Sequence, residues 1–215
     1  MGAIARSAAN NITTSGVFTS NAITNSSVTG ITVLANASDG ITLISSQTAS
    51  NSASISFTSG LTSTYKAYKF VFSNIHATTD NAELTFNMST DGGSNYNVAK
   101  TTTLFDAYHN ENDTDTNLGY ETTHDLAQGT GFADLTVNQG NGADESSSGT
   151  MLLFNPSSTT YVKHYISCFS ENEFSDRSFN IFSAGYGNTT SAVNAIQFKM
   201  NTGNIDGTIY LYGIK

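Results

Sequence analysis

The chain has 215 residues, of which Ser, Thr and Asn supply 82, or 38%, and charged residues only 12%. Ser, Thr, Asn and Gly are poor residues for helix interiors, while 13 Phe and 10 Tyr are too many for a disordered chain, so the composition predicts an all-β protein. A net charge of -9, with only eight Lys and Arg, argues against nucleic acid as a partner.

The first 40 residues are nearly uncharged. Up to residue 60, Arg6 and Asp39 are the only charged side chains, and apolar residues recur at spacings that fit neither a helix nor a strand. We expect residues 1–40 to form an extended arm that buries its apolar side chains on a neighbouring protein. The alternative is a mobile low-complexity tail. The anchoring candidates in the arm are Ile4, Ile12, Val17, Phe18 and Ile23.

No leader or membrane span is expected. The N-terminus MGAIARSAAN lacks the apolar core of a signal peptide, and the longest apolar run is MLLF at residues 151–154. A single cysteine, Cys168, permits no disulfide framework within the chain. We therefore expect stability to come from packing or from assembly.

A two-residue alternation of apolar and polar side chains begins near residue 41 and predicts β-strands. In the segment 65–76, Tyr68, Phe70 and Phe72 share one face, and the segment 82–89 has the same pattern. We expect these two segments to be adjacent strands of one sheet, and the Gly pair in residues 90–95 to form a tight hairpin turn. Further strands are predicted at residues 41–46, 53–58, 101–108, 132–137, 150–155, 160–169, 178–184, 194–200 and 207–212.

Ten or so strands in one chain of this length predict an antiparallel β-sandwich. We expect a jelly-roll-like head domain at residues 41–215, preceded by the N-terminal arm at residues 1–40.

The stretch from Asp106 to Glu145 carries nine acidic residues and no Lys or Arg. Residues 108–125 lack an apolar period, so we expect one or two long exposed loops, which are often functional. Carboxylates at alternate positions there could hold Ca²⁺, but the spacing of an EF-hand is missing, so we assign no metal and no cofactor. The candidate receptor-facing residues are Tyr108, His109 and Tyr120.

Motifs for catalysis were not found. The sequence has no Gly-x-Ser-x-Gly elbow, no Walker loop and no GxGxxG. A carboxylate pair for glycoside hydrolysis needs a distance in space that sequence spacing cannot establish. Cys168 alternates with Ile166 and His164, so we expect a buried packing thiol beside a hydrogen-bonded structural histidine.

Three stretches of the head resemble a family of virion-associated, fibre- or decoration-like proteins of tailed bacteriophages, marine ones in particular. They are residues 63–97, 152–167 and 196–215, and the match covers most of residues 41–215. Its specific parts are a Tyr-x-x-Tyr run that leads to Asp-Gly-Gly at residues 91–93, and the terminal Gly-Thr-Ile-x-Leu-Tyr-Gly at residues 207–213. The N-terminal AIARSAANNITTSGVFTS is similar to the start of such proteins. The resemblance supplies no catalytic residues.

The resemblance implies a non-enzymatic structural protein on the virion surface. We expect the arm to join other virion proteins of the capsid or tail and the head to face outward, as a tail fibre or a capsid decoration in contact with the host. By analogy with phage fibres and decorations, we expect a homotrimer.

The sequence leaves two other functions open. One is a carbohydrate-binding adhesin whose acidic loops at residues 106–145 grip a host surface glycan, with or without Ca²⁺. The other is an enzyme that cuts polysaccharide, which would need a cleft with two close carboxylates.

Overall fold

The computed structural model describes residues 40–215, and in them β-strands are joined by turns and loops. This part of the chain contains no helix that could span a membrane. The predicted arm, with Ile4, Ile12, Val17, Phe18 and Ile23, lies outside the described residues apart from Gly40.

The strands of the described part are β1 (Ile41–Ser52), β2 (Ile55–Phe57), β3 (Ala67–Ala77), β4 (Leu84–Ser89), β5 (Lys100–Asn110), β6 (Thr116–Tyr120), β7 (Ala133–Asp134), β8 (Ser147–Phe154), β9 (Lys163–Glu173), β10 (Arg177–Gly187), β11 (Ala195–Met200) and β12 (Ile205–Ile214).

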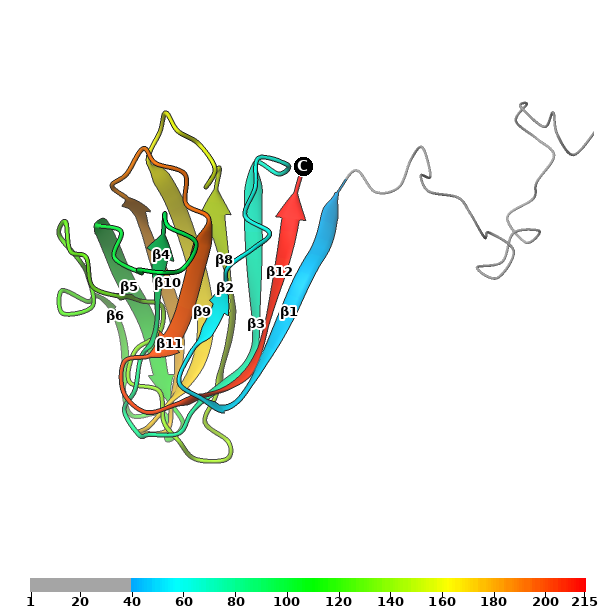
Figure 1. Cartoon of the computed structure of the whole chain (residues 1–215). Helices are drawn as coiled ribbons and strands as arrows, with labels where there is room; N and C mark the ends of the chain where they lie inside the picture. The colour runs from blue at the N-terminus through cyan, green and yellow to red at the C-terminus, as the bar shows by residue number, and fades with distance from the viewer. Residues whose placement is uncertain (1–39) are drawn as a thin grey trace, which may run out of the picture. The chain divides into compact units, whose positions relative to one another are not determined.

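The strands form two antiparallel sheets, one of eight strands and one of four, that enclose the core (Figure 1). The larger sheet has the order β1-β12-β3-β8-β9-β10-β5-β6 and the smaller sheet β2-β11-β4-β7. Eight strands pair in a nested way, since β1 pairs with β12, β2 with β11, β3 with β8 and β4 with β7. This nesting is the topology of a jelly roll, so the predicted β-sandwich is confirmed.

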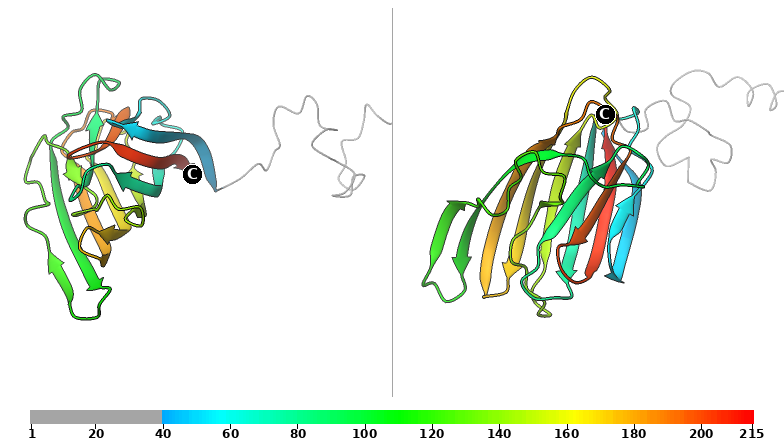
Figure 2. Two further views of the ribbon diagram at one scale, coloured as in Figure 1. Left: turned by 90° about the horizontal axis from the view of Figure 1, so that it is seen from below. Right: turned by 60° about the vertical axis from the view of Figure 1, so that its left-hand side comes forward.

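Two hairpins widen the jelly roll on one side. They are β5 with β6, inserted between β4 and β7, and β9 with β10, inserted between β8 and β11. All four strands extend the larger sheet beyond β8 (Figure 2). The smaller sheet has only four strands, so part of the inner face of this extension is covered by connecting loops instead.

Two predictions about strand neighbours are wrong. Strands β3 and β4 lie in different sheets, and residues 90–95 do not close a hairpin, because β4 pairs with β11 and β7 while β5 pairs with β10 and β6. The physical reason is that β3 and β4 both turn their aromatic side chains to the same core. Two strands can do so equally well from facing sheets as from one sheet.

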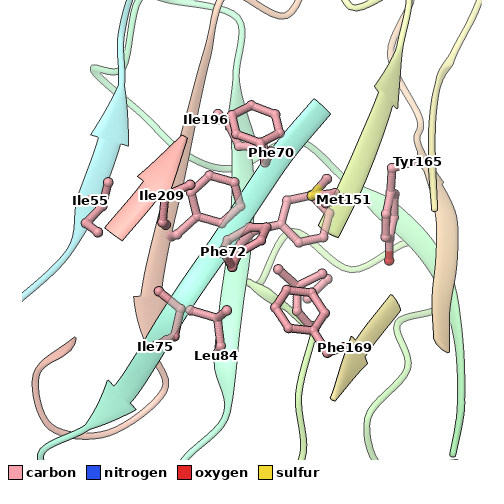
Figure 3. Close-up of a cluster of buried hydrophobic side chains, with 14 of the residues drawn as sticks. Ile55, Phe70, Phe72, Ile75, Leu84, Met151, Tyr165, Phe169, Ile196 and Ile209 are labelled. Carbon is pink, nitrogen blue, oxygen red and sulfur yellow. The ribbon is translucent and has the colours of Figure 1, made fainter. Parts of the chain in front are cut away.

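An aromatic cluster fills the centre of the core between the sheets. The ring of Phe198 on β11 lies 5.2 Å from Phe70 and 5.0 Å from Phe72, both edge to face. Figure 3 shows Phe70 and Phe72 together with Ile75, Leu84 and other fully buried apolar side chains of the core. The inward face predicted for the segment 65–76 is therefore confirmed.

Lys100 on β5 is fully buried among oxygen atoms. Its Nζ donates to Asn87 Oδ1 at 2.7 Å and to the carbonyl oxygens of Val98 and Gly131 at 2.9 and 2.8 Å. The bond to Asn87 ties β5 to β4 of the smaller sheet. No carboxylate is among the partners, and burial lowers the pKa of Lys100 to about 7.

The buried lysine predicts a pH dependence of stability. The pKa of Lys100 falls from 10.5 to about 7 on folding, so above pH 7 the folded chain releases a proton that the unfolded chain still holds. The free energy of unfolding should therefore rise as the pH increases from 7 towards 10. We expect this rise to be smaller in Lys100→Met, where the lowered pKa of Lys163 still contributes, as measured by urea unfolding followed by circular dichroism. The control Lys69→Met, on the outward side of β3, should keep it. An unchanged rise in Lys100→Met would contradict the assignment.

Candidate functional site

A polar cleft of about 150 Å³ lies on the inner side of the extension of the larger sheet. Two of its walls are β5 and β10, and the others are the connections that follow β6 and β7. The cleft is lined by Asp106, Tyr108, Glu121, His124, Val137, Asn138, Arg177 and Phe179.

The alternation of β5 places Asp106 in this cleft. Lys100, Thr102, Leu104 and Asp106 are the buried positions of the strand and point to the core side. After β6 the chain folds back across them, since Thr102 and Leu126 are joined by hydrogen bonds of 2.9 and 2.8 Å. This return places Glu121 and His124 over the end of β5.

Asp106 is a buried carboxylate without a hydrogen-bond partner in the described part of the chain. The residue is only 2% exposed and lines the cleft, and no hydrogen bond contributes to the shift of its pKa. Burial raises the pKa of Asp106 to about 6, and the charge of Glu121 adds to the rise while that of His124 opposes it. The oxygens of Asp106 are thus free to accept hydrogen bonds from a ligand.

His124 is held by Asp134. Its Nδ1 lies 3.0 Å from Asp134 Oδ2, and because a carboxylate only accepts, Nδ1 is the donor. This hydrogen bond raises the pKa of His124, although partial burial of the ring opposes the rise. The imidazole therefore holds a proton more readily than a free histidine, beside the carboxylates of Asp106 and Glu121.

The rim of the cleft is aromatic and carries one cation. The ring of Tyr108 lies 5.0 Å from that of Phe179, and the guanidinium of Arg177 lies 4.8 Å from the centre of the Tyr108 ring. Asp115 fixes both groups, because Tyr108 donates to its Oδ2 at 2.9 Å and Arg177 Nη2 lies 3.7 Å from the same atom.

A second carboxyl group lies deeper, behind Val137. The amide of Val137 donates to Glu171 Oε1 at 3.3 Å, while Oε2 of this buried residue has no partner in the described part. Burial raises the pKa of Glu171 well above its ordinary value. Since Glu171 is outside the cleft lining, we assign it a structural position rather than a role in binding.

The cleft offers hydrogen-bond acceptors beside an aromatic surface. Carboxylates accept from hydroxyl and ammonium groups, and the half-buried Tyr108 ring can contact an apolar part of a ligand. Among residues 40–215, no group of three or more His, Cys, Asp or Glu side chains is arranged to hold a metal ion.

The structure does not bring the three predicted receptor-facing residues together. Tyr108 points to the inner side and lines the cleft, whereas His109 and Tyr120 lie on the outward side of β5 and β6. Each is bonded to a nearby carboxylate, His109 to Asp113 at 3.0 Å and Tyr120 to Asp125 at 2.6 Å.

Sequence reasoning missed most of the cleft. The alternation of β5 could have placed Asp106 beside Leu104 on the core side. Arg177 and Phe179, however, come from a strand some seventy residues later in the sequence. No local signal links them to Asp106, because only the pairing of β10 with β5 brings them close.

The prediction of a buried thiol is wrong. Cys168 does share a side of β9 with Ile166 and His164, but that side faces outward, and Cys168 is exposed. The larger apolar residues Tyr165 and Phe169 occupy the inward positions of β9, and they decide which side is buried.

Comparison with protein-family models, with curated proteins and with solved structures finds no match to this chain. The relation to phage virion proteins therefore stays a prediction that rests on the sequence resemblance.

Proposed function

We propose that the protein is a non-enzymatic structural component of the surface of a tailed-phage virion. Residues 1–40 attach it to capsid or tail proteins, and the jelly-roll head faces outward as a fibre or decoration. The observation that carries the proposal is that the head forms a β-sandwich with its own core without residues 1–39. Strand β1 begins at Ile41, and the described residues already enclose a continuous apolar core.

The surface of the head supports the same proposal. Only three ion pairs occur in residues 40–215, and two of them involve histidine. Solubility therefore rests on Ser, Thr and Asn side chains and on net negative charge, as suits a protein displayed in many copies.

The copy number in purified virions tests this function. Quantitative mass spectrometry against the major capsid protein should detect the chain in every preparation. A ratio of at least about one to ten would indicate a capsid decoration, and a few tens of copies or fewer a fibre or adhesin at the tail or a vertex. Absence from particles would overturn the proposal.

The cleft favours a second candidate function, that of a carbohydrate-binding adhesin. Asp106 is buried yet has no partner among the described residues, and sugar hydroxyl groups are donors that would supply one. Tyr108, half-buried at the rim of the cleft, adds an aromatic group that an apolar part of a sugar can contact.

Binding of the protein to immobilised host envelope polysaccharide tests the second function. We expect binding without release of reducing sugar, because the proposed role is attachment and not cleavage. Binding that survives a chelator would exclude a need for Ca²⁺, and release of sugar would indicate an enzyme instead.

A further inference from the structure

The outer face, meaning the side of the larger sheet that points away from the core, is nearly free of charge. In its eight strands, Lys69 and Asp206 are the only charged residues at outward positions. Eight of the ten large apolar side chains that the described residues expose lie on this face: Ile41, Leu43, Phe105, Leu118, Tyr120, Phe154, Ile166 and Phe182.

Two neighbouring rows of side chains cross the strands at the centre of the outer face, and their large and small residues come in opposite order. The strand register gives the first row, from β5 to β8, as Phe105, Phe182, Cys168 and Thr150. The second row is Thr103, Ala184, Ile166 and Leu152. The first row thus has two large residues followed by two small ones, and the second row has the reverse.

The relief of the outer face follows from this pattern. The rings of Phe105 and Phe182 stack with centroids 5.2 Å apart and planes at 12°, and so form one raised corner. Ile166 and Leu152 form the diagonal corner. The eight residues of the two rows line an apolar hollow of about 310 Å³.

This relief is complementary to itself under a two-fold rotation. Consider a second copy placed face to face, related by an axis that lies in the interface and runs along the strands between β10 and β9. Each large pair of one copy then lies opposite a small pair of the other. An axis across the strands gives the same result. Such an isologous contact closes at two copies.

We propose that the outer face is the interface between two copies of this chain, paired about a two-fold axis. About the axis along the strands, the six strands from β3 to β6 overlap, and at about 4.8 Å between strands and about 3.3 Å per residue they measure on the order of 900 Å². A stable interface needs about 800 Å² from each partner, so the face is large enough.

The distribution of charge favours a second copy over other occupants. The chain has a net charge of -9, and its exposed acids, such as Asp113, Asp115 and Asp125, lie in loops away from the two rows. Two copies can therefore meet through the outer face without opposing carboxylates. A glycan would need several hydrogen-bonding groups, whereas the two rows supply only two Thr hydroxyls and one thiol.

Two-fold pairing does not depend on the virion proposal and differs from the trimer expected by analogy. Sedimentation velocity of the full chain should give a species of twice its 22.7 kDa mass. Phe182→Glu and Ile166→Glu should each give a monomer, because they place carboxylates in the apolar interface. The matched control is Phe174→Glu, in the turn between β9 and β10, which should stay dimeric. Phe174 and Phe182 are similarly exposed, at 41% and 38%.

The single cysteine supplies a second readout that requires no variant. Cys168 lies in the first row, so pairing should protect its thiol from maleimide at high protein concentration. Dilution below the dissociation constant should raise the labelling rate at least about tenfold. This measurement decides the question if a Glu variant fails to fold. A trimer, a monomer with a reactive thiol at about 100 μM, or a dimer that persists in both folded Glu variants would overturn the inference.

Discussion

Deletion of residues 1–40 is expected to abolish incorporation of the protein into virions and to leave the head folded. Strand β1 begins at Ile41 and pairs with β12 from its first residue, Ile41 opposite Ile214. The sequence before it carries only two charged residues and the five proposed anchoring side chains, of which Phe18 is the largest. Quantitative mass spectrometry of particles assembled with the truncated chain measures incorporation, and circular dichroism of the purified head measures folding.

The control for this deletion is a full-length chain altered in the head. Tyr161→Ser removes a side chain that is 70% exposed in the loop between β8 and β9, and it should leave incorporation unchanged. Two results would contradict the expectation. Unfolding of the truncated chain would mean that the arm belongs to the core, and normal incorporation would place the anchor in the head.

Alternation of apolar and polar residues predicted most strands of the head, because most strands bury one side. β3 is an example, since Tyr68, Phe70 and Phe72 are fully or almost fully buried. β6 was missed for the opposite reason. It is an edge strand whose residues are exposed or half-exposed, so no core selects its side chains. A strand that buries neither side shows no two-residue alternation of apolar and polar residues in the sequence.

Strand partners and buried sides were harder to predict than the strands themselves. The jelly roll pairs β1 with β12 and β2 with β11, across most of the chain, and no local pattern records such contacts. On β9 both sides carry apolar residues, because Ile166 and Cys168 point outward while Tyr165 and Phe169 point inward. Alternation alone could not decide between them.

Of the candidate site, the sequence predicted the acidic region and Tyr108 but not the cleft. In the sequence, nothing distinguishes the nine acidic residues from Asp106 to Glu145 from one another by burial. The structure separates them, since Asp106 is buried on the inner side while Asp113 lies at the tip of the β5–β6 hairpin with a side chain that is 90% exposed. Burial is what makes Asp106 chemically distinct, and burial depends on the tertiary fold.

Replacement of Asp106 by Asn is expected to weaken glycan binding at least about tenfold while it stabilises the protein. An unpartnered buried carboxylate lowers stability, and a binding site retains one when a ligand supplies the missing hydrogen bonds. The pKa of Asp106 rises from 3.8 to about 6 on folding, and each pKa unit is equivalent to about 1.4 kcal/mol. Because the cleft is open to water, we expect a gain of about 2 kcal/mol at pH 7.

The sign of the pH dependence follows from the raised pKa. The folded chain holds the proton of Asp106 more tightly than the unfolded chain, so this residue favours folding below about pH 4, and that benefit is lost as the pH rises through 6. In Asp106→Asn the loss should be smaller than in the unaltered protein, because other groups with a raised pKa, such as Glu171, still contribute to it. Urea unfolding at pH 4 to 8 measures the difference.

The control for this substitution is Asp113→Asn, which removes the same charge from the exposed hairpin. It should change the free energy of unfolding by less than about 0.5 kcal/mol and leave glycan binding intact. If Asp106→Asn is stabilised but binds glycan as the unaltered protein does, the cleft is not the glycan site. If it is destabilised, then Asp106 accepts a hydrogen bond within the folded protein and is not free for a ligand. The two measurements therefore separate the role of Asp106 in stability from its role in recognition.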